Sequence, residues 1–168
     1  MKKSILKALA TLTVALVLPI ASPSLAQEGV TVLSEADLRS LVTFGPAAQL
    51  KLAECETKSY PTCTYIWGLP DSGDAARMAL GGKPDGDKLL TIFAQARSLA
   101  DFDRVLGSYK DAVPVENLGV AAVWSDARDQ LSLITVDNLI IHVYVQIWKL
   151  DDPKATAMRV ADFLLAAS

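Results

Sequence analysis

Two apolar runs on either side of Asp137 and Asn138 constrain the fold of this chain more than any other feature. The first run is Leu131 to Val136, and the second is Leu139 to Trp148. An Asp-Asn pair favours a tight turn, because both residues tolerate a positive φ better than most. We therefore predict an antiparallel hairpin near the C-terminus, and it is the most secure tertiary contact that the sequence offers.

Three helices are predicted from the patterns at their N-termini. Ser34 and Ser98 are each followed three residues later by an aspartate, which is the spacing of a capping box. Asp152 precedes Pro153, and proline suits the first position of a helix. The expected helices cover residues 34–42, residues 98–109 and the segment from Asp152 onward.

Strands are expected where β-branched, aromatic or apolar residues run between turn signals. Residues 49–55 fit a helix or a strand equally, and residues 69–87 are interpreted as a long surface loop with a short helical turn. The expected strands are 64–67, 89–94, 120–124, 131–136 and 139–148. Strands linked mostly as hairpins, with helices on one side, indicate an α+β fold with a mainly antiparallel sheet of about five strands.

The N-terminus has the organisation of a secretory signal peptide. Lys2, Lys3 and Lys7 precede an apolar stretch that is too short to span a bilayer comfortably, and small residues lead to Ala26. We expect cleavage after Ala26, so that 1–26 is a signal peptide and 27–168 is a single domain. No cysteine near the cut can carry a lipid, and no later segment is long and apolar enough to insert stably in a membrane. A periplasmic or secreted location follows.

The charge that remains after such a cleavage argues against nucleic-acid partners. Three of the 16 basic residues leave with the peptide and all 19 acidic residues stay, so 13 minus 19 gives a net charge of −6. An acidic surface of this size does not match phosphate backbones or anionic lipid.

The two cysteines, Cys55 and Cys63, are predicted to form a disulfide, because an exported chain matures in an oxidising compartment. The alternatives are a redox pair and a metal site. The spacing differs from that of a redox motif, and no histidine lies nearby.

The last predicted strand supplies the candidate ligand-binding face. Alternation places Leu139, Ile141, Val143, Val145 and Ile147 on one face, which we assign to the core. The opposite face is aromatic and hydrogen-bonding, which is typical of a sheet surface that meets a ligand or a partner. The alternative is that the 69–87 loop or a helix covers this face. The candidate ligand-binding residues are His142, Tyr144, Gln146 and Trp148, with Trp124 on the neighbouring strand as an extension.

No catalytic residue, metal ligand or cofactor is predicted. His142 is the one histidine of the chain, no Gly-x-Ser-x-Gly elbow presents a nucleophile, and no phosphate-binding loop is found. Four aspartates in the 69–87 loop do not have the spacing of an EF-hand, so calcium is not expected there. They are Asp71, Asp74, Asp85 and Asp87.

Several short motifs are similar to those of a class of small bacterial envelope domains, secreted or lipid-anchored, whose function is unknown. They are Ser34 to Leu38 after the export signal, Cys63 followed by Tyr65 and Trp67, and Asn117 to Ala121 ahead of the hairpin. The resemblance implies a fold and a location and carries no catalytic residues.

Three functions are consistent with these features. The leading hypothesis is an exported, non-enzymatic binding domain that holds a small apolar ligand or a protein partner on the His142 face. The second is a protein-protein interaction or inhibitor-type module whose acidic 69–87 loop engages another protein. The third is a hydrolase whose site the sequence does not reveal, in which His142 would be essential.

Overall fold

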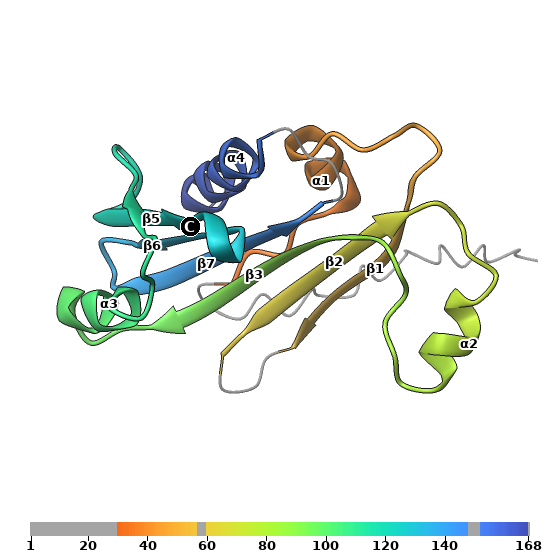
Figure 1. Ribbon diagram of the computed structural model, residues 1–168, viewed down its shortest axis with the longest axis horizontal. Helices are drawn as coiled ribbons and strands as arrows, with labels where there is room; N and C mark the ends of the chain where they lie inside the picture. Colours follow the sequence, from red (N-terminus) through yellow and green to blue (C-terminus); the bar gives the residue numbers. More distant parts are fainter. Residues whose placement is uncertain (1–29, 57–59, 148–151, 168) are drawn as a thin grey trace, which may run out of the picture.

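The computed structural model describes residues 30–56, 60–147 and 152–167. These residues form one antiparallel sheet of seven strands in the order β1-β2-β3-β7-β6-β5-β4 (Figure 1). The strands are β1 (Gln49–Glu56), β2 (Thr62–Gly68), β3 (Asp87–Gln95), β4 (Val113–Pro114), β5 (Ala121–Ser125), β6 (Gln130–Ile134) and β7 (Leu139–Gln146). The helices are α1 (Glu35–Leu41), α2 (Asp74–Ala79), α3 (Leu99–Leu106), the 3₁₀-helix η1 (Asp126–Arg128) and α4 (Pro153–Ala166).

The predicted α+β class and antiparallel sheet are confirmed, but the sheet has seven strands where about five were expected. One additional strand is β1, the stretch whose sequence fitted a helix or a strand. The other is β4, a two-residue edge strand that ends in Pro114, and so short a segment carries no periodicity to detect. The predicted signal peptide and Trp148 lie outside the described residues.

The predicted hairpin forms between β6 and β7. Ile134 pairs with Ile140, and Asn138 has a φ of 59°, which places it in the left-handed region that the turn requires. At one edge of the sheet, Cys55 and Cys63 are register partners on β1 and β2, and a disulfide joins them. The predicted pairing is therefore confirmed, and it fixes the edge strand to the sheet.

The helix caps follow the predictions with one exception. The Ser34 side chain accepts from the Asp37 amide, and the Asp37 carboxylate accepts from the Ser34 amide, which is the expected capping box. Asp152 caps α4 through the amide of Ala155. The capping box expected for α3 is absent, since Ser98 makes no cap bond and Asp101 accepts from the Arg97 amide instead.

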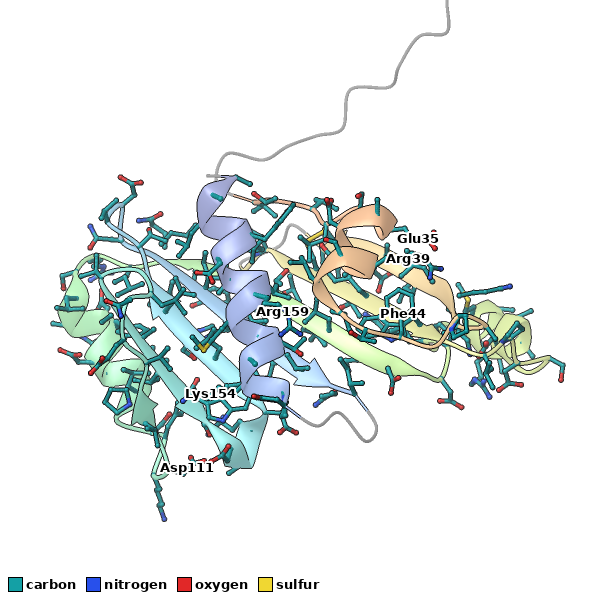
Figure 2. The ribbon with its side chains drawn as sticks, turned by 90° about the horizontal axis from the view of Figure 1, so that it is seen from above. Glu35, Arg39, Phe44, Asp111, Lys154 and Arg159 are labelled. Atoms are coloured by element: carbon teal, nitrogen blue, oxygen red, sulfur yellow. A yellow bond between two sulfur atoms is a disulfide. The ribbon has the colours of Figure 1, made fainter. Side chains whose placement is uncertain are left out.

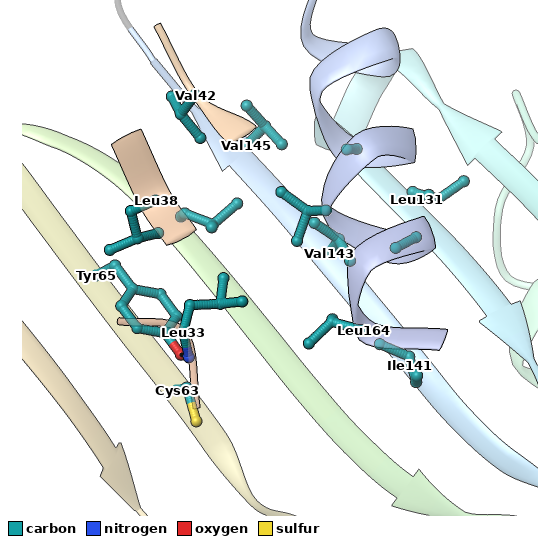
Figure 3. Close-up of a cluster of buried hydrophobic side chains, with 14 of the residues drawn as sticks. Leu33, Leu38, Val42, Cys63, Tyr65, Leu131, Ile141, Val143, Val145 and Leu164 are labelled. Carbon is teal, nitrogen blue, oxygen red and sulfur yellow. Dashed lines mark hydrogen bonds between the residues drawn. The ribbon is translucent and has the colours of Figure 1, made fainter. Parts of the chain in front are cut away.

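The face of the sheet on which α1 and α4 pack is called the upper face. Val143 and Leu131 of the sheet and Leu38 and Leu164 of the two helices are buried in one hydrophobic core (Figure 3). Figure 2 shows α4 lying across the sheet with α1 beside it, and Arg159 ties the two helices because its Nε donates to the Leu41 carbonyl over 3.1 Å.

Not all helices share that face. Phe102 of α3 is fully buried against Ile134 and Ile140, whose side chains belong to the opposite, lower face of the sheet. The expectation that the helices gather on one side is therefore wrong for α3. Its apolar stripe was recognised in the sequence, but a stripe does not reveal which face of a sheet it covers.

Candidate functional site

The middle of the lower face carries the predicted candidate residues. Across the sheet, Ile92 of β3 pairs with His142 of β7, and Leu90 pairs with Tyr144. All four side chains are half-buried, whereas their neighbours on the upper face, such as Val143, are fully buried. We call these four residues the central strip. None of the described helices lies below this part of the sheet in Figure 1, where α3 and α2 are at its two ends.

His142 is held by a polar network on β6. Its Nδ1 lies 2.8 Å from the Ser132 hydroxyl and 2.9 Å from Nε2 of Gln130, and both of these residues are fully buried. Nε2 of Gln130 also donates to the Tyr109 hydroxyl over 2.9 Å, and the Arg128 guanidinium stacks on the Tyr109 ring. The imidazole is therefore fixed on one edge by neighbours that are themselves immobilised.

The network occupies one nitrogen of His142 and leaves the other free. Nδ1 faces the Gln130 amide and the Ser132 hydroxyl, whereas Nε2 has no partner among the described residues. Burial lowers the pKa of His142 to about 4 from its ordinary value of 6.5, so the neutral form persists at neutral pH.

The structure places the other candidate residues of β7 and β5 in different environments. Tyr144 lies in the central strip, and burial raises the pKa of its hydroxyl. Gln146 is exposed at the end of β7, and Trp148 lies outside the described residues. Trp124 does not extend the face, because its register partner Leu131 places it on the upper side, where it is buried and donates to Asp126 over 2.6 Å. Sequence alternation fixed the faces within one strand but not between neighbouring strands.

Two segments cover the ends of the lower face. After α3 the chain returns across β5, where Asp111 accepts from the Ser125 hydroxyl and from the Ala127 amide. At the opposite end, Pro84 is buried and Lys83 pairs with Glu54 over 2.6 Å. The expected covering of the face is thus present at both ends, while the central strip between them stays partly exposed.

A hollow adjoins the central strip at the α3 end. Its volume is about 320 Å³, and Ala94 and Ile140 contribute to its wall. These two residues are register partners and form the next pair after Ile92 and His142 on the same face. The sequence does not predict this hollow, because it arises where Tyr60, the β3–α3 segment and Ile140 of β7 meet, and these three parts lie far apart in the chain.

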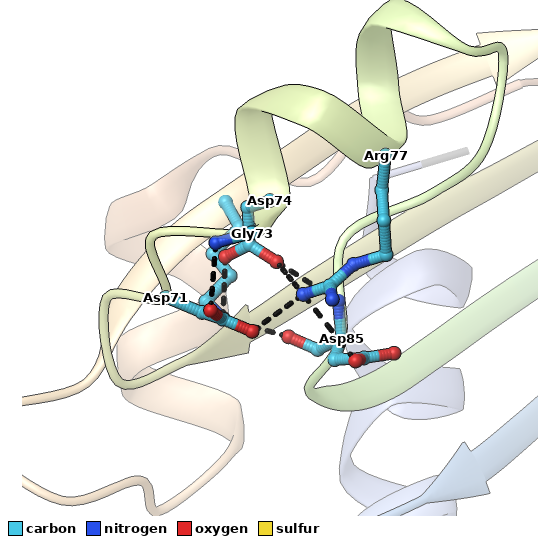
Figure 4. Close-up of polar contacts among 6 residues, drawn as sticks. Asp71, Gly73, Asp74, Arg77 and Asp85 are labelled. Carbon is cyan, nitrogen blue, oxygen red and sulfur yellow. Dashed lines mark hydrogen bonds and ion pairs between the residues drawn. The ribbon is translucent and has the colours of Figure 1, made fainter.

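Three aspartates of the 69–87 loop surround the guanidinium of Arg77 (Figure 4). Arg77 contacts Asp71, Asp74 and Asp85, and Lys51 lies 2.8 Å from Asp74. The Lys51 hydrogen bond is the main cause that lowers the pKa of Asp74 to about 2. These three carboxylates therefore already form ion pairs with Arg77 or Lys51. Within the described residues, no cluster of His, Cys, Asp and Glu could hold a metal ion.

A second, smaller hollow of about 170 Å³ lies beside the end of α1 on the upper side, lined by Arg39, Val42, Thr43 and Phe44. Phe44 stacks on the buried Trp67 with ring centroids 5.3 Å apart, and Arg39 lies over the Phe44 ring. These contacts close the upper core at this end. None of the described residues that line this hollow is a candidate residue.

No protein-family model matches this chain, and neither a curated protein nor a solved structure matches it. The comparisons therefore supply no function, and the site must be interpreted from its own chemistry. The disulfide fits a protein of the periplasm or the extracellular space. Within the described part of the chain, no helix is both long and apolar enough to cross a bilayer.

Proposed function

We propose that this protein is an exported, non-enzymatic binding domain that holds a small, largely apolar ligand on the central strip. The observation that carries the proposal is the fixed His142 imidazole. Its Nε2 is a free hydrogen-bonding atom on a ring that lies opposite Ile92 and next to the Leu90–Tyr144 pair. An apolar surface with few oriented polar groups is the usual composition of a small-molecule site.

The arrangement around His142 supports binding over hydrolysis. The hydroxyl that contacts the imidazole belongs to Ser132, whose side chain is fully buried and so is out of reach of a substrate. The ring meets that hydroxyl through a nitrogen that Gln130 also occupies, and its low pKa makes it a weak base. Each of these contacts orients the ring, which is what a ligand site requires.

Native mass spectrometry of the protein purified from its own cell envelope tests the proposal. We expect a retained non-protein mass in the wild type and its loss in Tyr144→Ala, which removes an aromatic wall of the strip. Phe163→Ala is the matched control, because Phe163 is a half-buried aromatic residue of α4 on the other side of the sheet. Equal retention by both variants, or no bound mass in the wild type, would contradict the proposal.

A second candidate function is protein binding through the 69–86 segment, favoured by its exposed apolar side chains. Leu69 is 67% exposed and Leu80 is 89% exposed. Three of the aspartates expected to engage a partner, Asp71, Asp74 and Asp85, are instead paired with Arg77 or Lys51, so they position the segment and leave the leucines at its surface. Leu80→Ser would then abolish capture of a protein partner, while Val136→Ser at the β6–β7 turn would not.

A further inference from the structure

The hollow beside α3 and the central strip form one continuous surface. Ala94 and Ile140 border the hollow, and Ile92, His142, Leu90 and Tyr144 follow them in register along β3 and β7. From Ala94 to Leu90 the strand advances four residues, or about 13 Å at the rise of an antiparallel strand, which is the length of an extended chain of about ten carbons. A linear apolar group can therefore lie along this row of residues, which we call the track.

The charged groups at the rim of the hollow give the track a direction. Arg97, Asp101 and Arg104 border it, and Arg104 pairs with Asp101 over 2.9 Å. Asp101 also accepts from the Arg97 amide, which is the main cause that lowers its pKa, and the charges of Arg104 and Arg97 lower that pKa further. The rim therefore carries two positive charges against one negative charge, on a chain whose overall net charge is −3.

We propose that this surface binds a single-chain anionic amphiphile, such as a medium-chain carboxylate. The carboxylate contacts Arg97, with Arg104 nearby, and the alkyl chain lies over Ile140, Ile92 and Leu90. The inference rests on the proposed binding function and adds the chemical class of the ligand. A guanidinium matches the planar geometry of a carboxylate, and the aliphatic side chains under the alkyl chain, half-buried at Leu90 and Ile92, match its apolar character.

Methyl NMR of the oxidised protein tests the inference with two probes of equal chain length and opposite charge, decanoate and decyltrimethylammonium. We expect decanoate to shift the methyl signals of Leu90, Ile92 and Ile140 in a saturable manner, and to bind at least tenfold more tightly than the cation. The expected effect of Arg97→Glu is a loss of at least tenfold in decanoate affinity, with a smaller loss for Arg97→Gln.

The control is Lys154→Glu, which makes the same charge change in the first turn of α4, on the opposite side of the sheet. A negative side chain is favourable at that position, so this variant is expected to fold and to bind decanoate within twofold of the wild type. Since Arg97 is exposed, the folding of its variants is checked by the dispersion of their own methyl spectra.

Two results would overturn the inference in distinguishable ways. If both probes shift the central strip equally and Arg97→Glu changes nothing, an apolar site exists but the anionic head group is wrong, and the proposed binding function survives. If neither probe produces saturable shifts at these methyl groups, the ligand of this surface is not an amphiphile. The mass measurement on envelope material then decides the binding function separately.

Discussion

Acidification is expected to destabilise the folded protein in a window set by His142. In the folded state burial lowers the pKa of this imidazole to about 4, while the unfolded chain titrates near 6.5. Between these values the unfolded chain binds more protons than the folded protein, so the free energy of unfolding falls as the pH drops through 6.5. Below about pH 4 the imidazole is protonated in both states, and His142 causes no further loss. From pH 7.5 to pH 5 the expected loss is about 2 kcal/mol.

Urea unfolding at the two pH values measures this loss, with His142→Gln as the comparison. Carboxylates titrate equally in both proteins, so the difference between their losses isolates the imidazole. We expect the variant to lose about 2 kcal/mol less than the wild type between pH 7.5 and pH 5. A second measurement needs no variant, because the chain has one histidine and its ring proton titrates alone in the NMR spectrum. A midpoint near 6.5, or equal losses in the two proteins, would refute the buried, neutral imidazole.

Three further predictions concern stability and are checked by urea unfolding. Replacing both Cys55 and Cys63 by Ala opens a ring with a sequence separation of 8. This should lower the free energy of unfolding by about 2.5 kcal/mol, and no change would mean that the bridge does not constrain the unfolded chain. Tyr65→Phe leaves the Leu33 amide, now bonded over 2.9 Å, without its acceptor and should cost about 1 to 3 kcal/mol, so a neutral result would contradict that bond. Gly119→Ala places a methyl group 2.6 Å from a carbonyl oxygen at a φ of 60° and should cost at least about 1 kcal/mol, whereas a stabilised variant would show that the turn differs.

The sequence predicted those parts of the fold that depend on local signals. The Ser34 capping box, the Asp152 cap and the turn at Asn138 are each set by residues within four positions of one another, so their chemistry is readable without the tertiary structure. The disulfide was predictable because only one pairing of two cysteines exists.

Features that depend on contacts between distant elements could not be predicted in the same way. Trp124 was assigned to the wrong face because the register between β5 and β6 is a tertiary property. The His142 network joins side chains from β6, β7 and the segment after α3, and nothing in the spacing of Gln130, Ser132 and Tyr109 indicates that they converge. The hollow beside α3 was missed for the same reason.

The proposed binding function requires that the central strip is exposed, and a soluble paramagnetic probe measures this exposure most directly. Methyl signals of Leu90 and Ile92, which face the open side, should relax strongly as a gadolinium chelate is added. Signals of Leu89 on β3 and Val143 on β7, which are fully buried on the upper face of the sheet, should change little. Equal protection of all four residues would show that the strip is covered, and it would contradict the binding function proposed for it.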